Sequence, residues 1–382
     1  IYDDVAAWLF DEGSSDEIPQ ASLRDDLERL RLAYRALAKA RRRRHAIEFE
    51  TSEVYFRFDE QRKIEAIEPM RRNQAHQLIE ECMIAANICA ARFLKKHRLP
   101  ALYRIHEGAN ADKLPGLQEF LASFGIAFTA TTPTPLDYAK IVEQAQSLPE
   151  SELIQTVLLR SMLQASYSPN PKVGHFGLAL GDYAHFTSPI RRYPDLLVHR
   201  AIKHWLSAKS VEGYAYDAAR MQALGESCSR YERRAEDATR DASDWLKCEF
   251  LQKHIGSQFD GVVTGVTNFG LFVRLDELLI DGLVHVTSLK RDYYHFDAAH
   301  HQLVGETSGW TYRLGDLLTV EVARVDLEER KIDFDLIRQL EDRDRRKVRI
   351  SSKKSAHGKS KKHRSTAKKA QGRKTGARGK RR

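Results

Sequence analysis

Two adjacent arginines follow a Ser-Pro pair in the segment HFTSPIRRYPDLLVHR, which covers residues 185–200. Ser188 is a favourable helix N-cap and Pro189 a favourable first helical residue, so this pair predicts a helix start. The free backbone N–H groups of a helix N-terminus attract anions, and an arginine guanidinium can bind two phosphate oxygens at once. Arg191 and Arg192 therefore form a candidate phosphate-binding site. The alternative is a solvated basic corner that only caps a helix.

Two carboxylates, Glu80 and Glu81, interrupt the otherwise apolar segment IEECMIAANICAARFL. The length and periodicity of this segment predict a helix over about residues 73–97 that is buried on most sides. Adjacent residues do not share a helix face, so at most one of the two carboxylates faces inward. A buried carboxylate needs a hydrogen-bonding partner, and a substrate hydroxyl is one candidate.

Aromatic residues spaced for base stacking occur in the segment that follows His254. The stretches QFDGVVTGVTNFGLFVRL, DGLVHVTSL and RLGDLLTVEVARVDLEERKIDFDL predict five short strands within about 85 residues, which is typical of a small closed barrel of the OB type. Phe269, Phe272 and His285 would then lie together on the outer face of the barrel, as a platform for unpaired bases. The alternative is that one or more of them fills the barrel core.

The net charge is divided unevenly between the body of the chain and its end. Residues 345–382 hold 18 Lys or Arg and no Asp or Glu, whereas the whole chain has a net charge of +9, so the first 344 residues have a net charge of −9. A segment with so few apolar residues cannot fold alone. Its expected partner is a polyanion, most often a nucleic acid, with anionic lipid and simple solubilisation as weaker alternatives.

The sequence gives no support to a membrane or secreted protein. It contains no run of eighteen apolar residues, and its start does not resemble a signal peptide, so we expect a cytoplasmic protein. The four cysteines form no Cys-x-x-Cys pair, which argues against a thiolate metal site.

Several segments resemble the ribonuclease II/ribonuclease R family, which carries the RNB domain. They are HFGLALGDYAHFTSPIRRYPDLLVH (residues 175–199), IEECMIAAN (79–87), ATRDASDWL (238–246) and an S1-type barrel ending in RKIDFDL. The RDYYHFD insert and the basic tail look more like the ribonuclease R branch. The resemblance implies an α+β chain: the C-terminal part of an RNB catalytic domain at residues 1–250, an S1 RNA-binding domain of OB fold at 254–338, and a disordered Lys/Arg-rich tail at 343–382.

The same resemblance implies a function. Family members are hydrolytic 3′→5′ exoribonucleases that use magnesium and release nucleoside 5′-monophosphates from single-stranded and 3′-tailed structured RNA, in RNA decay and quality control. Arg191 matches the family's active-site arginine, which holds the scissile phosphate, and Ser188 and Arg192 are expected to contact RNA beside it. Tyr2 and Glu80 match residues that help to distinguish ribose from deoxyribose. Phe49 matches an aromatic on which a terminal base stacks.

No magnesium ligands are predicted within this chain. In the family, aspartates upstream of the position that matches Tyr2 hold the metal, and we expect that segment to lie outside this chain. The acidic groups that are present look like helix-end, ion-paired or strand residues, and they are Asp3, Asp4, Asp25, Asp26, Asp237, Asp241, Asp244, Asp333 and Asp335. A non-catalytic S1-type RNA-binding or ribosome-associated protein is therefore the alternative, with the ribosome as a possible partner of the basic tail.

Overall fold

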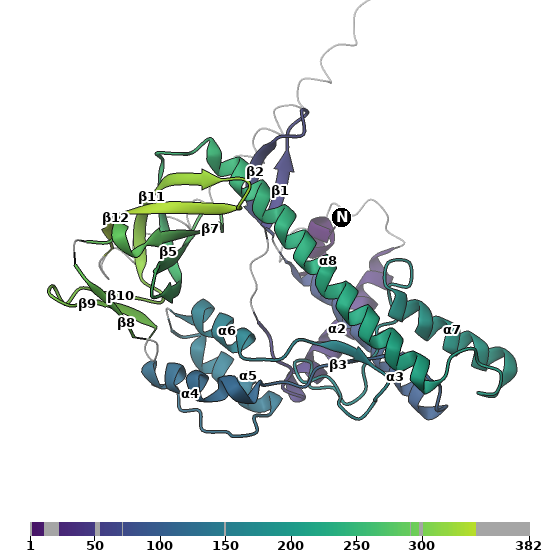
Figure 1. Ribbon diagram of the computed structural model, residues 1–382. Coiled ribbons are helices and arrows are strands. Elements are labelled where there is room, and N and C mark those ends of the chain that lie inside the picture. Colours follow the sequence, from purple (N-terminus) through teal and green to yellow (C-terminus); the bar gives the residue numbers. More distant parts are fainter. Residues whose placement is uncertain are drawn as a thin grey trace, which may run out of the picture. The chain divides into compact units, whose positions relative to one another are not determined.

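The computed structural model describes residues 2–10, 23–49, 54–70, 72–148, 150–290, 292–297 and 301–340. The chain forms two compact units, one mainly from Ile1–Phe250 and the other mainly from Leu251–Phe296, Gln302–Asp326 and the chain from Lys331 onward. Helices dominate the first unit and strands the second (Figure 1), which confirms the predicted α+β class. The tail predicted at residues 343–382 lies outside the described residues.

Helices and two short antiparallel strand pairs build the first unit. The helices are α1 (Tyr2–Phe10), α2 (Arg24–Arg43), α3 (Gln74–Lys96), α4 (Leu114–Ser123), α5 (Pro135–Ala145), α6 (Ser151–Arg160), α7 (Tyr193–Ala208) and α8 (Ala218–Gln252). The strand pairs are β1 (Val54–Phe58) with β2 (Ile64–Pro69), and β3 (Tyr103–Ile105) with β4 (Ser166–Ser168). In the described part of the chain, no helix is long and apolar enough to cross a membrane.

The helix predicted over residues 73–97 is α3, and it lies at the centre of the first unit. Asn73 caps its N-terminus by accepting hydrogen bonds from backbone N–H groups of the first turn, including that of His76 at 3.2 Å. Near the other end, the fully buried Leu94 belongs to one apolar cluster with Val198 of α7. The apolar face of α3 therefore packs against α7.

Phe49, the aromatic expected to stack on a terminal base, does not lie in a strand. It is half-buried in the coil after α2, and β1 begins only at Val54. The antiparallel register pairs Val54 with Pro69, the last residue of β2.

The helix start predicted at Ser188 and Pro189 is wrong, because residues 188–192 form a turn, here called the arginine turn. The backbone N–H groups of Arg191 and Arg192 donate to the Ser188 carbonyl, at 3.3 and 3.0 Å. Arg192 then adopts an extended conformation (φ −121°, ψ 116°), which interrupts any helix that begins before it. The helix that follows is α7, which begins at Tyr193.

A closed five-stranded barrel forms the second unit, as the strand pattern predicts. Its strand order is β11-β12-β7-β6-β5, and the pairing of β5 with β11 completes the barrel. The pairing of β12 with β7 is parallel. The strands are β5 (Gln258–Thr267), β6 (Gly270–Leu275), β7 (Asp281–His285), β11 (Leu317–Asp326) and β12 (Lys331–Gln339). Buried aliphatic residues such as Leu271, Val273 and Val320 alternate with outward-facing residues along these strands.

The second unit has two further local features, a glycine that lets two barrel strands approach and a separate small sheet. Gly270 has a φ of 154°, and a Cβ there would lie 2.3 Å from the carbonyl oxygen of Val284, so only glycine fits where β6 approaches β7. The tyrosine-rich insert forms a separate three-stranded sheet in the order β10-β9-β8. Its strands are β8 (Tyr294–Asp297), β9 (Gln302–Gly305) and β10 (Thr311–Arg313).

Candidate functional site

The two arginines of the arginine turn have different environments. Arg191 is exposed, and within the described residues its side chain makes no hydrogen bond or ion pair. Arg192 is only 21% exposed in its side chain, and its Nη2 lies 2.7 Å from Oδ1 of the completely buried Asp195. Only Arg191 therefore presents an unshared guanidinium to an anion. The guanidinium of Arg192 is already committed to a carboxylate.

Asp195 holds the arginine turn in place, and the sequence analysis missed it. Its Oδ1 accepts hydrogen bonds from the Ser188 backbone N–H at 2.8 Å and from Arg192 at 2.7 Å. The Ser188 side chain caps no helix, in contrast to the prediction. The i,i+3 spacing of Arg192 and Asp195 across the first turn of α7 was the available signal. Burial of the carboxylate could not be inferred from that spacing.

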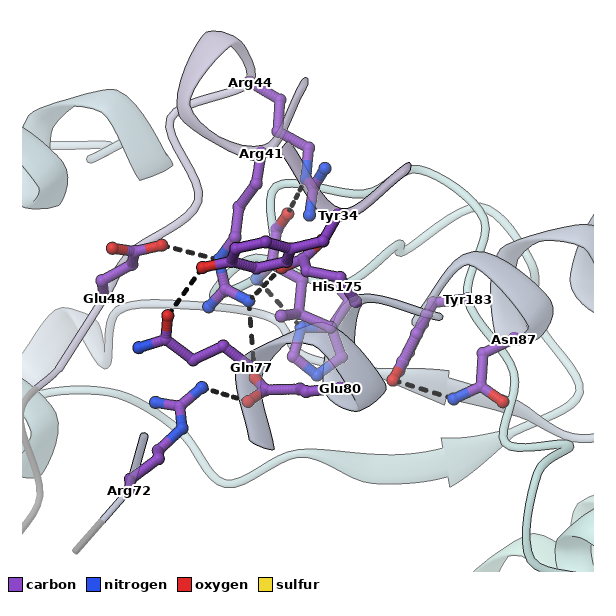
Figure 2. Close-up of polar contacts among 12 residues, drawn as sticks. Tyr34, Arg41, Arg44, Glu48, Arg72, Gln77, Glu80, Asn87, His175 and Tyr183 are labelled. Atoms are coloured by element: carbon purple, nitrogen blue, oxygen red, sulfur yellow. Dashed lines mark hydrogen bonds and ion pairs between the residues drawn. The ribbon is translucent and has the colours of Figure 1, made fainter. Parts of the chain in front are cut away.

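A second group of polar contacts holds residues 183–186, which precede the arginine turn. The buried Asn87 of α3 donates from Nδ2 to the Tyr183 hydroxyl at 3.1 Å, and its Oδ1 accepts from the Phe186 backbone N–H at 2.9 Å (Figure 2 shows the first contact). Burial lowers the pKa of both His175 and His185 to about 3. Both imidazoles are therefore neutral near pH 7, and neither is a proton donor there.

Tyr2 and Glu80, the two residues expected to recognise ribose, both lie along the N-terminal half of α3. The Tyr2 ring stacks on His76, with ring centroids 4.2 Å apart and an interplanar angle of 16°. Asn73 also donates from Nδ2 to Asp3 of α1 at 2.8 Å. Glu80 follows His76 by one helical turn, so its carboxylate lies on the same side of α3.

Of the two adjacent glutamates, Glu81 is the buried one, and Glu80 is 38% exposed. The prediction that at most one faces inward is therefore confirmed, although the inward residue is not the ribose candidate. Arg41 of α2 donates from Nη1 to Glu81 at 2.8 Å. It also donates to Glu80 at 3.4 Å, and Arg72 pairs with Glu80 as well (Figure 2). Arg41 pairs in addition with Glu48 at 2.9 Å. These pairs place the coil before Phe49 next to Glu80.

The barrel residues predicted as a stacking platform lie on its outside. Phe269 is 44% exposed and Phe272 is 37% exposed, and their ring centroids are 6.0 Å apart at 87°. His285 is exposed, and it pairs across the sheet with Gly270 between the two phenylalanines. The alternative that these aromatics fill the barrel core is wrong. The three side chains are available to planar ligands from solvent.

The described residues do not fit a magnesium site. Among them, no group of three or more His, Cys, Asp or Glu side chains lies close enough together to hold a metal ion. The acidic candidates are engaged elsewhere or dispersed: Asp3 accepts from Asn73, Asp237 pairs with Arg240, and Asp333 lies in strand β12. Magnesium in nuclease sites needs several clustered oxygen ligands.

The sequence matches two domain families. Residues 1–208 match the RNB domain, and residues 252–336 match the S1 RNA binding domain. The chain belongs to the RNB family. This result confirms the resemblance noted from the sequence, and it makes the arginine turn part of an RNB domain.

Curated relatives and solved structures agree with this assignment. Ribonuclease R of Vibrio cholerae is 53% identical over 321 residues, covering 81% of this chain and 39% of the relative. Ribonuclease R of Escherichia coli is 51% identical over 340 residues, covering 86% of this chain and 42% of the relative. The chain thus spans about two-fifths of the length of these relatives. The apo structure of Mycoplasma genitalium RNase R has a TM-score of 0.79 at 27% identity, covering 88% of this chain and 53% of that one.

Proposed function

We propose that this chain carries part of the active site of a hydrolytic 3′→5′ exoribonuclease that releases nucleoside 5′-monophosphates. The observation that carries the proposal is Arg191, an exposed guanidinium that has no partner among the described residues and lies on a turn held by Asp195. The ribonuclease R relatives support the reaction class. A structure of Mycoplasma genitalium RNase R in complex with ribose-methylated single-stranded RNA supports the substrate class.

In this proposal Arg191 holds the scissile phosphate. Its planar fork binds two phosphate oxygens and offsets the charge that develops on them in the transition state. Glu80 accepts a hydrogen bond from a ribose 2′-hydroxyl, which deoxyribose lacks. Arg41 and Arg72 fix the direction of that carboxylate. Tyr2 contacts the same sugar.

The remaining predicted contacts concern bases and the incoming strand. Phe49 stacks on a terminal base, and Phe269, Phe272 and His285 stack on unpaired bases. Ser188 and Arg192 act on RNA mainly through the shape of the turn, because Arg192 is paired with Asp195. The substrates are single-stranded and 3′-tailed structured RNA in cytoplasmic decay and quality control, with the ribosome as a further partner of the basic tail.

Magnesium enters this proposal only through the family, since the described residues offer no site for it. We therefore derive no step of the reaction from a metal bound to this chain. A non-catalytic RNA-binding protein remains the second candidate, and the same observation on the acidic residues favours it.

Stepwise digestion of RNA tests the proposal. The 382-residue chain and the complete product of its reading frame are incubated with magnesium and a 5′-labelled single-stranded RNA. We expect stepwise shortening by the complete product, and a loss of about 100- to 1000-fold in rate for Arg191→Ala, as for removal of one transition-state donor. Arg92→Gln, an exposed arginine on α3, is the control. Unchanged cleavage by Arg191→Ala would refute the assignment, and binding without shortening by either protein would favour the second candidate.

A further inference from the structure

Two tyrosines and two arginines meet on the surface just beyond the arginine turn, and we call them the α7–α8 patch. They are Tyr193, Arg200, Tyr216 and Arg220. Arg200 donates from Nη1 to the hydroxyl of Tyr216 at 2.9 Å and to that of Tyr193 at 3.4 Å. Its guanidinium carbon also lies 5.8 Å from the Tyr193 ring centroid, and that of Arg220 lies 5.2 Å from the Tyr216 ring centroid.

The positive charge of the α7–α8 patch is not neutralised by acidic side chains. In the described parts of the chain, neither Arg200 nor Arg220 forms an ion pair with a carboxylate. Asp217, the nearest acid along the chain, accepts from the Arg220 backbone N–H at 2.8 Å, at the start of α8. Other arginines of the same unit are paired with acids, as Arg104 is with Glu232 at 2.6 Å.

The hydroxyl groups of the patch add hydrogen-bonding capacity to this charge. A phenol that accepts from a guanidinium keeps its own proton to donate, so Tyr216 can donate to an anion while it accepts from Arg200. The pKa of Tyr216 is lowered, first by a hydrogen bond from Tyr193 and then by Arg200 and Arg220. An oxyanion is therefore favoured at this place on the surface.

We infer that the α7–α8 patch binds a backbone phosphate of the RNA strand, distinct from the phosphate at Arg191. Tyr193 follows the arginine turn directly, and Arg200 lies about 10 Å further along α7 from Tyr193 at 1.5 Å per residue. A strand held at the arginine turn can therefore reach the patch within one or two nucleotides. The exposed Tyr193 ring supplies a surface for the adjoining base or sugar. This inference rests on the proposed function.

The salt dependence of RNA binding measures the number of phosphates that the protein contacts. A fluorescein-labelled oligouridylate is bound to the 382-residue chain in EDTA, so that no cleavage occurs, and log Kd is plotted against log salt concentration. Each phosphate contact to a single strand contributes about 0.7 to the slope. We expect Arg200→Gln to lower the slope by about 0.7, Arg191→Gln to lower it by a similar amount, and the double variant to lower it by about 1.4. Arg92→Gln should leave it unchanged.

Two further variants separate charge from geometry in the patch. Arg200→Lys keeps the charge and loses the planar fork, so the slope should stay while the affinity falls several-fold. Tyr216→Phe removes a hydroxyl and keeps the ring under Arg220, so the affinity should fall several-fold without a change in slope. Equal far-UV circular dichroism spectra establish that the variants remain folded.

The outcomes separate the patch from the proposed function. A wild-type slope for Arg200→Gln, together with a reduced slope for Arg191→Gln, overturns the patch and leaves the proposed function standing. A double variant no lower than either single variant overturns the assignment to separate phosphates. A slope unaffected by Arg191→Gln counts against the proposed function, whatever Arg200→Gln does.

Protection of Tyr193 from iodination distinguishes RNA from the mononucleotide product as the ligand of the patch. If uridine 5′-monophosphate protects Tyr193 and RNA does not, the patch is a product site and the inference is wrong.

Discussion

Replacement of Asp195 with alanine should lower the free energy of unfolding of the first unit by more than the loss of an exposed ion pair does. The carboxylate is completely buried, and it accepts from the Ser188 N–H at 2.8 Å and from Arg192 at 2.7 Å. Alanine leaves both donors without their acceptor. One of these donors carries a positive charge on a side chain that is only 21% exposed.

The size of the effect follows from these two hydrogen bonds. Both bonds are to a charged carboxylate, and each such bond contributes about 1.5–3 kcal/mol. Their loss gives about 3–6 kcal/mol, a range that includes the cost of about 3–5 kcal/mol for removal of one partner of a buried ion pair. Asp195→Asn keeps an acceptor in place of Oδ1 and removes only the charge, so about half of that loss is expected.

Urea denaturation followed at 222 nm measures this loss, because the helices belong almost entirely to the first unit. Asp237→Ala is the matched control: Asp237 also pairs with an arginine at i,i+3, but the two side chains are 64% and 69% exposed. Its free energy of unfolding should fall by less than about 0.5 kcal/mol. A loss below about 1 kcal/mol for Asp195→Ala would show that Asp195 does not hold the arginine turn as argued.

Two further measurements address the histidines and the barrel. Stability should fall as the pH is lowered from 7 towards 5, because burial lowers the pKa of His175 and His185 to about 3 in the folded chain whereas unfolded histidine takes up protons near 6.5. Each contributes a loss of up to about 1.4 kcal/mol per pH unit below 6.5, which urea titrations should detect; equal stability at the two pH values would contradict the burial of both rings. Phe272→Ala should weaken the binding of single-stranded RNA by about 1–3 kcal/mol, as measured by fluorescence anisotropy. Ile337 is also exposed on the barrel, and Ile337→Ala should leave the binding free energy unchanged. Equal losses for the two variants would argue against a stacking platform.

Features set by local sequence could be predicted, and α3 is the clearest case. Asn73 supplies the cap, and the apolar spacing after it sets the length and direction of the buried face. The barrel strands likewise follow from period-two alternation and from the turn before Gly270. In both cases the signal lies within about one element, so no distant partner is needed to decide the structure.

Features decided by distant contacts could not be predicted. Ser188 and Pro189 suit the first two positions of a β-turn as well as a helix start. The hydrogen bond that the Ser188 N–H donates to Asp195 selects the turn. The partner of the buried Glu81 is likewise distant in sequence, since Arg41 of α2 donates to it at 2.8 Å. That contact spans 40 residues, so no local pattern contains it.

In the proposed site, the pairing of Arg192 with Asp195 gives the two adjacent arginines different roles. A buried carboxylate under the turn fixes its backbone, but alone it would place a negative charge close to the phosphate site and weaken the binding of an anion. Arg192 neutralises that charge at 2.7 Å, so Arg191 can act on the substrate with its full positive charge. The neutral state of His185, favoured by burial and by the nearby Arg192 charge, adds no proton that would change this balance with pH near neutrality. Arg192 thus neutralises the carboxylate that holds the turn, and Arg191 keeps its positive charge for the proposed phosphate.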